Sequence, residues 1–439
     1  MKLTTFIGLF TFILLFSGVP LSAQELDHNT FVSRVKAHNG DLQLSANQQK
    51  ATTEDTKIAK SLLLPNISTD GSYQRDFNKN FLFINDGFGG VSEFQTNFNN
   101  TVDVSAVASQ VLYDAEALST VKLAKLTEEL TKLNHENAST EIVAQASALY
   151  WQSIFLKESI AVLETNSNLA KEQFEQIEKI YQNGEVSLLQ LHQAKGLYKS
   201  TLPPVNNAKT QYKNLLTELK TLANIPVTDT IVLTDNLEQM QLADFILAEE
   251  NVELQPQIKA VKKEIEIANQ ELEGKKKFWF PKVNLIAAYN YNGQDDNFRF
   301  KNNENKLFFG QVRISIPIFS GGSNKAKIAK AEIEKQSAML HLDNTRRNLL
   351  KALKTAENDY NKALENIELN KETIAINESE IDIFRKQLGL DVVTPLQFKE
   401  SRLQLTQNRL ALLNSYLDLQ IARIQINRIL GNNILKLSQ

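Results

Sequence analysis

Apolar residues recur every seven positions along the second half of the chain. The series runs through Leu353, Tyr360, Ile367, Ile374, Ile381 and Leu388. Spacings of four and three residues place such a stripe on one helix face, where it packs against a partner helix in a left-handed supercoil. Leu149, Leu156 and Leu163 show the same step in the first half. The pattern predicts coiled-coil helices in both halves.

Glycine and proline, which destabilise helix interiors, are absent from residues 91 to 183 and 323 to 388. At ~1.5 Å per residue the second run can form a helix on the order of 100 Å long. The predicted helices lie at about 115–182 and 323–388, with return helices at about 187–222 and 393–430 and a further helix at about 252–278. Pro203 and Pro204 are expected to interrupt the first return helix.

Four shorter segments alternate apolar and polar residues, and they predict strands at about 66–76, 98–113, 282–292 and 306–318. In the last segment Val312 and Ile314 alternate with Arg313 and Ser315. Each segment has about the 9 to 11 residues that a tilted strand needs to cross a membrane. Alternation alone also fits a soluble sheet with one wet face.

Aromatic residues gather where the predicted strands meet the helices, and they favour the membrane interpretation. They are Tyr113, Phe278, Trp279, Phe280 and Phe319. Aromatic rings of this kind concentrate at membrane–water interfaces. Lys275 to Lys277 beside them fit an interfacial or solvated position better than a nucleic-acid patch.

The chain contains an internal repeat. Leu64-Pro65 matches Phe280-Pro281, and Gly184 matches Gly389 in the turn after each long helix. Each half therefore reads as helix, two strands, long helix, turn and helix. We expect repeats at 24–226 and 251–431, a linker at 227–250 and a short tail at 432–439. Residues 1–23 have the basic, apolar and small-residue regions of a secretory signal peptide.

Composition narrows the chemistry. The 439 residues are 42% hydrophobic and 23% charged with a net charge of −3, without the positive excess of a nucleic-acid binder. The chain has no cysteine, and its five histidines share no metal-ligand spacing. The glycines around residues 87 to 90 fit a loop between strands better than a phosphate site. We expect no metal, no cofactor and no enzymatic activity.

Four strands cannot close a barrel, and an open sheet edge in lipid leaves backbone groups unpaired. A membrane form must therefore oligomerise. Two copies would supply eight strands and three would supply twelve, and the strand count alone does not choose between them.

The order of these features resembles the TolC family of outer-membrane efflux ducts. The resemblance rests on Leu64-Pro65-Asn66, Phe280-Pro281-Lys282, the run from Ile316 to Gly322, and the turns at Gly184 and Gly389. It implies a homotrimer with a twelve-stranded barrel in the outer membrane and an α-helical barrel extending into the periplasm. It also implies contact with outer-membrane lipid, a periplasmic adaptor protein and, through the adaptor, an inner-membrane transporter in efflux or type I secretion.

The resemblance assigns two further groups of residues. Two acidic residues that narrow the periplasmic mouth in the family align with Gln397 and Glu400, so only one acid is retained here. The adaptor-docking turns correspond to Gly184, Glu185, Val186 and Ser187 in the first half and to Gly389, Leu390, Asp391 and Val392 in the second. The alternative interpretation is a periplasmic coiled-coil scaffold without a membrane barrel.

Overall fold

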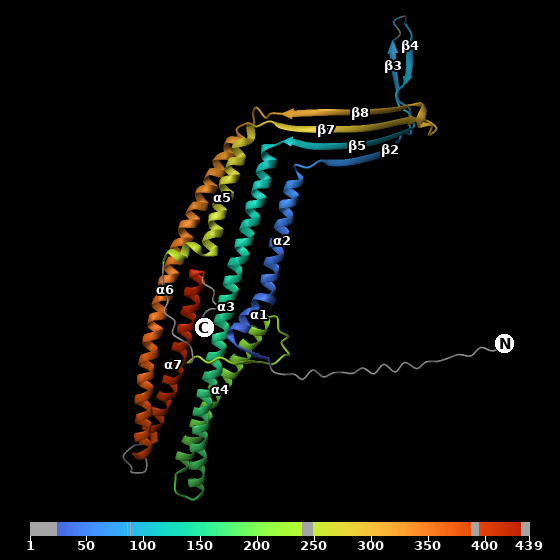
Figure 1. Cartoon of the computed structure of the whole chain (residues 1–439). Coiled ribbons are helices and arrows are strands. Elements are labelled where there is room, and N and C mark those ends of the chain that lie inside the picture. Colours follow the sequence, from blue (N-terminus) through green and yellow to red (C-terminus); the bar gives the residue numbers. More distant parts are fainter. Residues whose placement is uncertain (1–23, 86, 88, 239–248, 388–394, 432–439) are drawn as a thin grey trace, which may run out of the picture.

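The computed structural model of the chain combines long helices with a small antiparallel sheet at one end of the helical bundle (Figure 1). The structure describes residues 24–85, 87, 89–238, 249–387 and 395–431. The predicted signal peptide and C-terminal tail lie outside these residues, as do part of the predicted linker and the second docking turn.

Seven α-helices occur in the described residues. Two of them, with 68 and 65 residues, span the length of the molecule. They are α1 (His28–His38), α2 (Gly40–Ser61), α3 (Ala115–Gln182), α4 (Leu188–Leu222), α5 (Pro256–Lys276), α6 (Ser323–Gln387) and α7 (Pro395–Leu430). Short 3-10 helices cover η1 (Glu249–Leu254), η2 (Lys277–Trp279) and η3 (Phe300–Asn302).

The main sheet has four antiparallel strands in the order β2-β5-β7-β8. They are β2 (Asn66–Arg75), β5 (Asn100–Tyr113), β7 (Lys282–Asp295) and β8 (Glu304–Ser315). Each half of the chain supplies two neighbouring strands, so the two repeats meet between β5 and β7.

Helix starts are defined by local side-chain caps. Asp114 accepts hydrogen bonds from the backbone N–H groups of Glu116 and Ala117 and begins α3 directly after strand β5. Asn39 caps α2 in the same way and separates it from α1. Such caps satisfy N–H groups that have no partner within the helix. These two helix starts in the first half are therefore encoded locally.

The heptad positions of α6 form a buried seam. Leu353, Ile367 and Ile381 are buried, and Tyr360 and Ile374 are half-buried. Helix α6 packs against α7, and α3 packs against α4, as two antiparallel hairpins (Figure 1). The coiled-coil prediction is confirmed at these positions; Leu388 lies outside the described residues.

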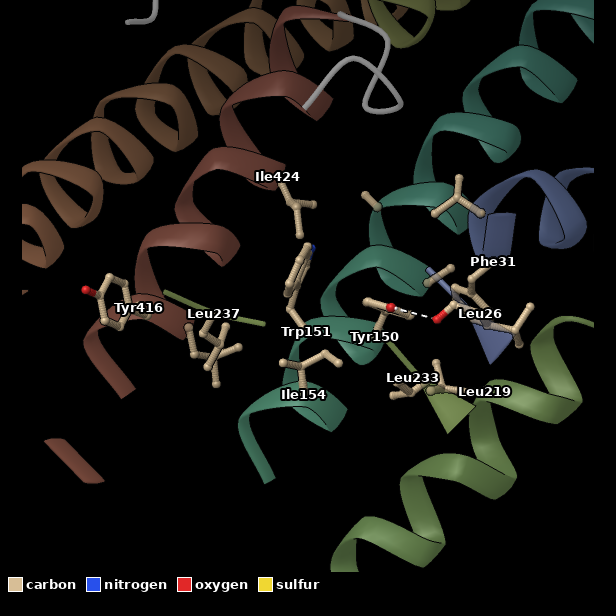
Figure 2. Close-up of a cluster of buried hydrophobic side chains, with 14 of the residues drawn as sticks. Leu26, Phe31, Tyr150, Trp151, Ile154, Leu219, Leu233, Leu237, Tyr416 and Ile424 are labelled. Atoms are coloured by element: carbon tan, nitrogen blue, oxygen red, sulfur yellow. Dashed lines mark hydrogen bonds between the residues drawn. The ribbon is translucent and has the colours of Figure 1, made fainter. Parts of the chain in front are cut away.

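A large cluster of buried hydrophobic residues surrounds the middle of α3. Tyr150 packs there beside Leu26, Phe31 and Leu233, and its hydroxyl donates to the backbone oxygen of Leu26 at 3.0 Å (Figure 2). Trp151 points to the other side of α3, toward Ile424 of α7 (Figure 2). This core joins the N-terminal segment, both hairpins and the chain between the repeats. It holds the two halves of the molecule in one packed unit.

The structure contains three features that the pattern analysis did not predict. A separate hairpin of β3 (Phe81–Asn85) and β4 (Val91–Gln95) projects from the far end of the main sheet (Figure 1). A parallel pair, β1 (Gln24–Leu26) with β6 (Ile231–Leu233), ties the predicted linker to the N-terminal segment.

The third is the course of α4, which continues through Pro203 and Pro204. The expected interruption is therefore wrong, and packing of α4 along α3 compensates for the missing backbone hydrogen bonds. Among the described residues, none of the helices has the length and apolar character needed to cross a membrane.

Candidate functional site

The strand register sorts the residues of the main sheet into two faces. Directly paired residues in neighbouring strands lie on the same face. Gly71, Val104, Tyr291 and Lys306 form one such row, and Ile67, Ala108, Ala287 and Gly310 form another. The same face carries Val283 opposite Ile314 and Leu285 opposite Val312. Most apolar positions of the four strands therefore lie on this face.

The opposite face is mainly polar. Asp70, Ser105 and Asn290 occupy one row, and Ser72, Asp103 and Asn292 occupy the next. The side-chain amide of Asn292 donates to the carboxylate of Asp103 at 2.6 Å. A sheet with one apolar and one polar face suits a wall between lipid and water.

Both edges of the main sheet are open within one chain. Every residue of β2 and of β8 is exposed, and each of these strands pairs with only one neighbour. Because the sheet is antiparallel throughout, β8 of one copy can pair in the antiparallel sense with β2 of the next. The sheet can thus be extended at both edges by further strands.

The predicted interfacial aromatics gather where the strands meet the helices. Phe278, Trp279 and Phe280 link α5 to β7, and the rings of Phe278 and Trp279 meet edge to face at 5.1 Å. Tyr113 ends β5, and Phe319, 85% exposed, lies between β8 and α6. Apart from half-buried Phe278, all of these side chains are exposed.

Polar contacts fix the helices below this junction side by side, in the order α2, α3, α5 and α6 (Figure 1). The hydroxyls of Thr53 and Thr56 donate to Glu128 at 2.9 and 2.8 Å, joining α2 to α3, and these bonds hold the pKa of Glu128 below its ordinary value. Gln270 donates to Ser119 at 3.1 Å between α5 and α3. The four helices continue the wall that the four strands begin.

A three-residue ionic brace holds the start of the second repeat. Glu253 accepts hydrogen bonds from Arg346 and Lys262, both at 2.7 Å. These partners lower the pKa of Glu253 from 4.5 to about 2. Glu253 and Arg346 are 93 positions apart, so no local pattern in the sequence could have revealed the pair.

The first predicted docking turn joins α3 to α4 at the far end of the molecule from the sheet (Figure 1). Gly184 has a φ of +82°, a conformation that L side chains avoid. Ser187 and Gln190 form a reciprocal capping box that begins α4. Glu185 and Ser187 are exposed and Val186 is half-buried. Gly389, Leu390, Asp391 and Val392 of the second turn lie outside the described residues.

The predicted mouth residues Gln397 and Glu400 lie in the first turns of α7, and both are exposed. Nearby, the Arg402 guanidinium donates to Gln173 of α3 at 3.3 Å, and Arg409 forms an ion pair with Glu378 of α6 at 2.7 Å. The Arg402 contact joins the second hairpin to the first near this end of the molecule, and the Arg409 ion pair joins the two helices of the second hairpin.

The chain matches the family model described as outer membrane efflux protein over residues 31–224 and 247–432. The two matched segments correspond to the two repeats. This chain belongs to the outer membrane efflux protein family. Outer membrane efflux proteins are channels and not enzymes. Their location in the outer membrane excludes the alternative interpretation of a periplasmic scaffold without a membrane barrel.

Known members of the outer membrane efflux protein family resemble this chain along most of its length. The cation efflux system protein CusC of Escherichia coli is 21% identical and covers 74% of this chain and 69% of its own length. The probable efflux pump outer membrane protein TtgC of Pseudomonas putida is 22% identical, and the match covers 90% of this chain and 80% of the length of TtgC. A crystal structure of CusC superposes with a TM-score of 0.78 at 17% identity, covering 92% of both chains.

Some residues of this efflux protein escaped prediction. The β3–β4 hairpin carries exposed Leu82, Ile84 and Phe94 in a segment where five-residue strands gave too short an alternation to identify. No group of three or more histidine, aspartate or glutamate side chains able to hold a metal occurs in the described part of the chain.

Proposed function

We propose that three copies of this chain form one duct through the outer membrane and into the periplasm. The open edges of β2 and β8 support closure by neighbouring copies, because unpaired backbone groups in lipid cost several kcal/mol each. Side chains would largely fill the interior of an eight-stranded barrel, whereas a barrel of twelve strands encloses a wider interior. A conducting path therefore favours three copies over two.

The observation that carries the proposal is the direct joining of this open-edged sheet to two very long helices. Helices of 68 and 65 residues extend about 100 Å, far more than a passive pore within the membrane requires. We infer that the duct is the outer-membrane component of a tripartite system. Substrates would enter the duct from an inner-membrane transporter by way of a periplasmic adaptor.

The adaptor would bind at the two hairpin ends. The turn from Gly184 to Ser187 is short, it is shaped by the positive φ of Gly184 and the capping box of Ser187, and it lies at the end of the molecule farthest from the sheet (Figure 1). The corresponding turn at residues 389 to 392 would complete the docking surface. Compact turns of this kind can concentrate binding energy in a few residues.

Two further assignments complete the proposal. Gln397 and Glu400 would face the lumen at the periplasmic mouth and form its narrowest ring. Tyr113, Phe278, Trp279, Phe280 and Phe319 would lie at the membrane–water interface on the periplasmic side, where aromatic rings are favoured. Residues 1–23 would direct export and be removed, and the repeats at 24–226 and 251–431 would each contribute two strands and one helical hairpin.

Deletion and complementation test this function. Cells lacking the protein should become more sensitive to a panel of toxic compounds or fail to secrete a protein substrate, and the intact gene should restore the loss. The protein should stay with the outer-membrane fraction through salt washing. Release by salt, or unchanged export of every compound and protein tested, would contradict the proposal.

A further inference from the structure

The polar face of the main sheet contains one apolar patch, midway along its strands. Val107, Ala288 and Phe309 occupy directly paired positions on β5, β7 and β8. Ile286 and Leu307 lie on the same face one row away on either side. We refer to these five residues as the inner apolar band.

Polar rows border the inner apolar band along the strand direction. Ile286 lies between Ser109 and Gln311 in one row, and Leu307 is paired with Asn290 in the other. Beyond Leu307 the face continues with Asp103 and Asn292. The band is therefore an interruption of a polar surface and not the beginning of a lipid-facing one.

Side-chain exposure differs between the two faces at the level of the inner apolar band. Phe309 is 36% exposed, whereas its neighbour Phe308, on the opposite face, is 75% exposed. Ala288 is only 4% exposed, although none of the α-helices in the described part of the chain packs on β7. The lower exposure of these residues and the polar rows on either side favour this face as the interior of a closed barrel.

We propose that the inner apolar band lines the lumen of the closed barrel and contacts the apolar parts of molecules that pass through it. This inference rests on the proposed trimer, which places three copies of the band at one level of the channel. Contact with apolar molecules is favoured in proportion to the apolar area that it removes from water. A ring of this kind also narrows the wet cross-section of the channel. Phe309, the largest side chain of the band, is the main contact.

Block of the ionic current tests this assignment. Purified trimers in planar bilayers are exposed to tetrabutylammonium, a cation with four apolar arms, and to tetramethylammonium as a probe of equal charge. The variants are Phe309→Ser and the matched control Phe308→Ser, which makes the same change on the opposite face. Tetrabutylammonium should block the wild-type channel, and Phe309→Ser should raise the concentration for half-block roughly tenfold, or about 1.4 kcal/mol.

The Phe308→Ser control and the small cation show whether block depends on the inner apolar band. Phe308→Ser should leave the block unchanged, and tetramethylammonium should act equally weakly on all three proteins. The proposed role of the inner apolar band would be overturned if tetrabutylammonium blocked wild type and Phe309→Ser equally or did not block wild type at all. A larger effect of Phe308→Ser than of Phe309→Ser would also overturn it. Failure of the wild-type protein to form trimers or to conduct ions would instead refute the proposed function.

Cysteine labelling gives an independent readout of the same assignment, because the chain has no cysteine of its own. Phe309→Cys in membrane-embedded trimers should react with a charged, water-soluble thiosulfonate, and Phe308→Cys should be protected by lipid. Preferential reaction of Phe308→Cys would place the band on the lipid side and reject the proposal.

Discussion

Neighbouring residues on one strand meet different environments in this protein. Val104 belongs to the apolar face of the sheet, and Ser105 belongs to the polar face. The side-chain direction of a strand reverses at each residue, so one step along the chain exchanges the apolar face for the polar face. The effect of a substitution therefore depends on which face of the sheet its side chain occupies.

Arginine substitution should separate the two faces. Val104→Arg should destabilise the barrel by about 2 to 4 kcal/mol if the residue lies near the bilayer midplane, because a charge is then placed in lipid. Ser105→Arg should cost much less, since its side chain can remain in water. Urea unfolding of the protein in lipid vesicles measures both values, and equal losses would show that the proposed faces are wrong.

A buried histidine makes stability depend on pH. His28 is 3% exposed, and its Nε2 lies 2.9 Å from the Ser147 hydroxyl. Burial lowers the pKa of His28 from 6.5 to about 4, although nearby Asp235 opposes the shift. The neutral form therefore predominates in the folded protein at neutral pH.

Because the folded-state pKa is lowered, the stability linked to His28 is complete above pH 6.5 and is lost as pH falls toward 4. The loss should reach roughly 3 kcal/mol per chain. Unfolding midpoints of wild type and His28→Gln, measured between pH 7 and 4, provide the comparison. The variant should show a shallower pH dependence; an identical dependence would assign the acid sensitivity to other groups.

The single acid at the predicted mouth should influence ion selectivity. In a trimer Glu400 becomes a ring of three carboxylates, whose field extends over about 8 to 10 Å at physiological salt. Glu400→Gln should lower cation selectivity, and Gln397→Asp should raise it. Reversal potentials in planar bilayers under a salt gradient report both changes. Identical potentials for both variants and wild type would remove these residues from the pore.

At the scale of elements, the first helical hairpin ends in a turn whose shape depends on one glycine and one cap. Gly184 adopts a positive φ, and Ser187 begins the return helix. This local construction places Glu185 and Val186 at the tip of the hairpin. Changes at these two residues should affect a partner more than the fold.

Glu185→Arg combined with Val186→Arg should abolish transport while trimer assembly and membrane insertion remain normal, because a docked adaptor would meet reversed charge and added bulk. Efflux in a strain lacking the wild-type gene provides the measurement. Glu218→Arg, an exposed position toward the other end of α4, is the matched control and should transport normally. Full transport by the double variant would exclude this turn from docking.

At the scale of the whole molecule, the four-stranded sheet is complete only in an assembly. Its two edge strands offer unpaired backbone groups in opposite directions, and the helical row below it also ends at α2 on one side and α6 on the other. Closure of both rows by the same rotation would remove every open edge at once.

We therefore expect a cyclic trimer in detergent. Native mass spectrometry of the purified protein should show three chains as the principal species across a tenfold dilution. A stable monomer or dimer as the main species would contradict the proposed assembly.

The sequence by itself determined the element types and the family. Heptad spacing, strand alternation and the Gly184 turn are local or periodic signals, and each reflects a preference that a few neighbouring residues express alone. The matched halves then specified the order of elements, which the family model and the fold bear out.

Only the tertiary structure decided how distant residues meet. It paired Glu253 with Arg346, carried α4 through Pro203 and Pro204, and aligned Val107, Ala288 and Phe309 across three strands. Each result depends on register or packing between segments far apart in the chain. Such contacts are set by the free energy of the whole packed unit, so no local spacing encodes them.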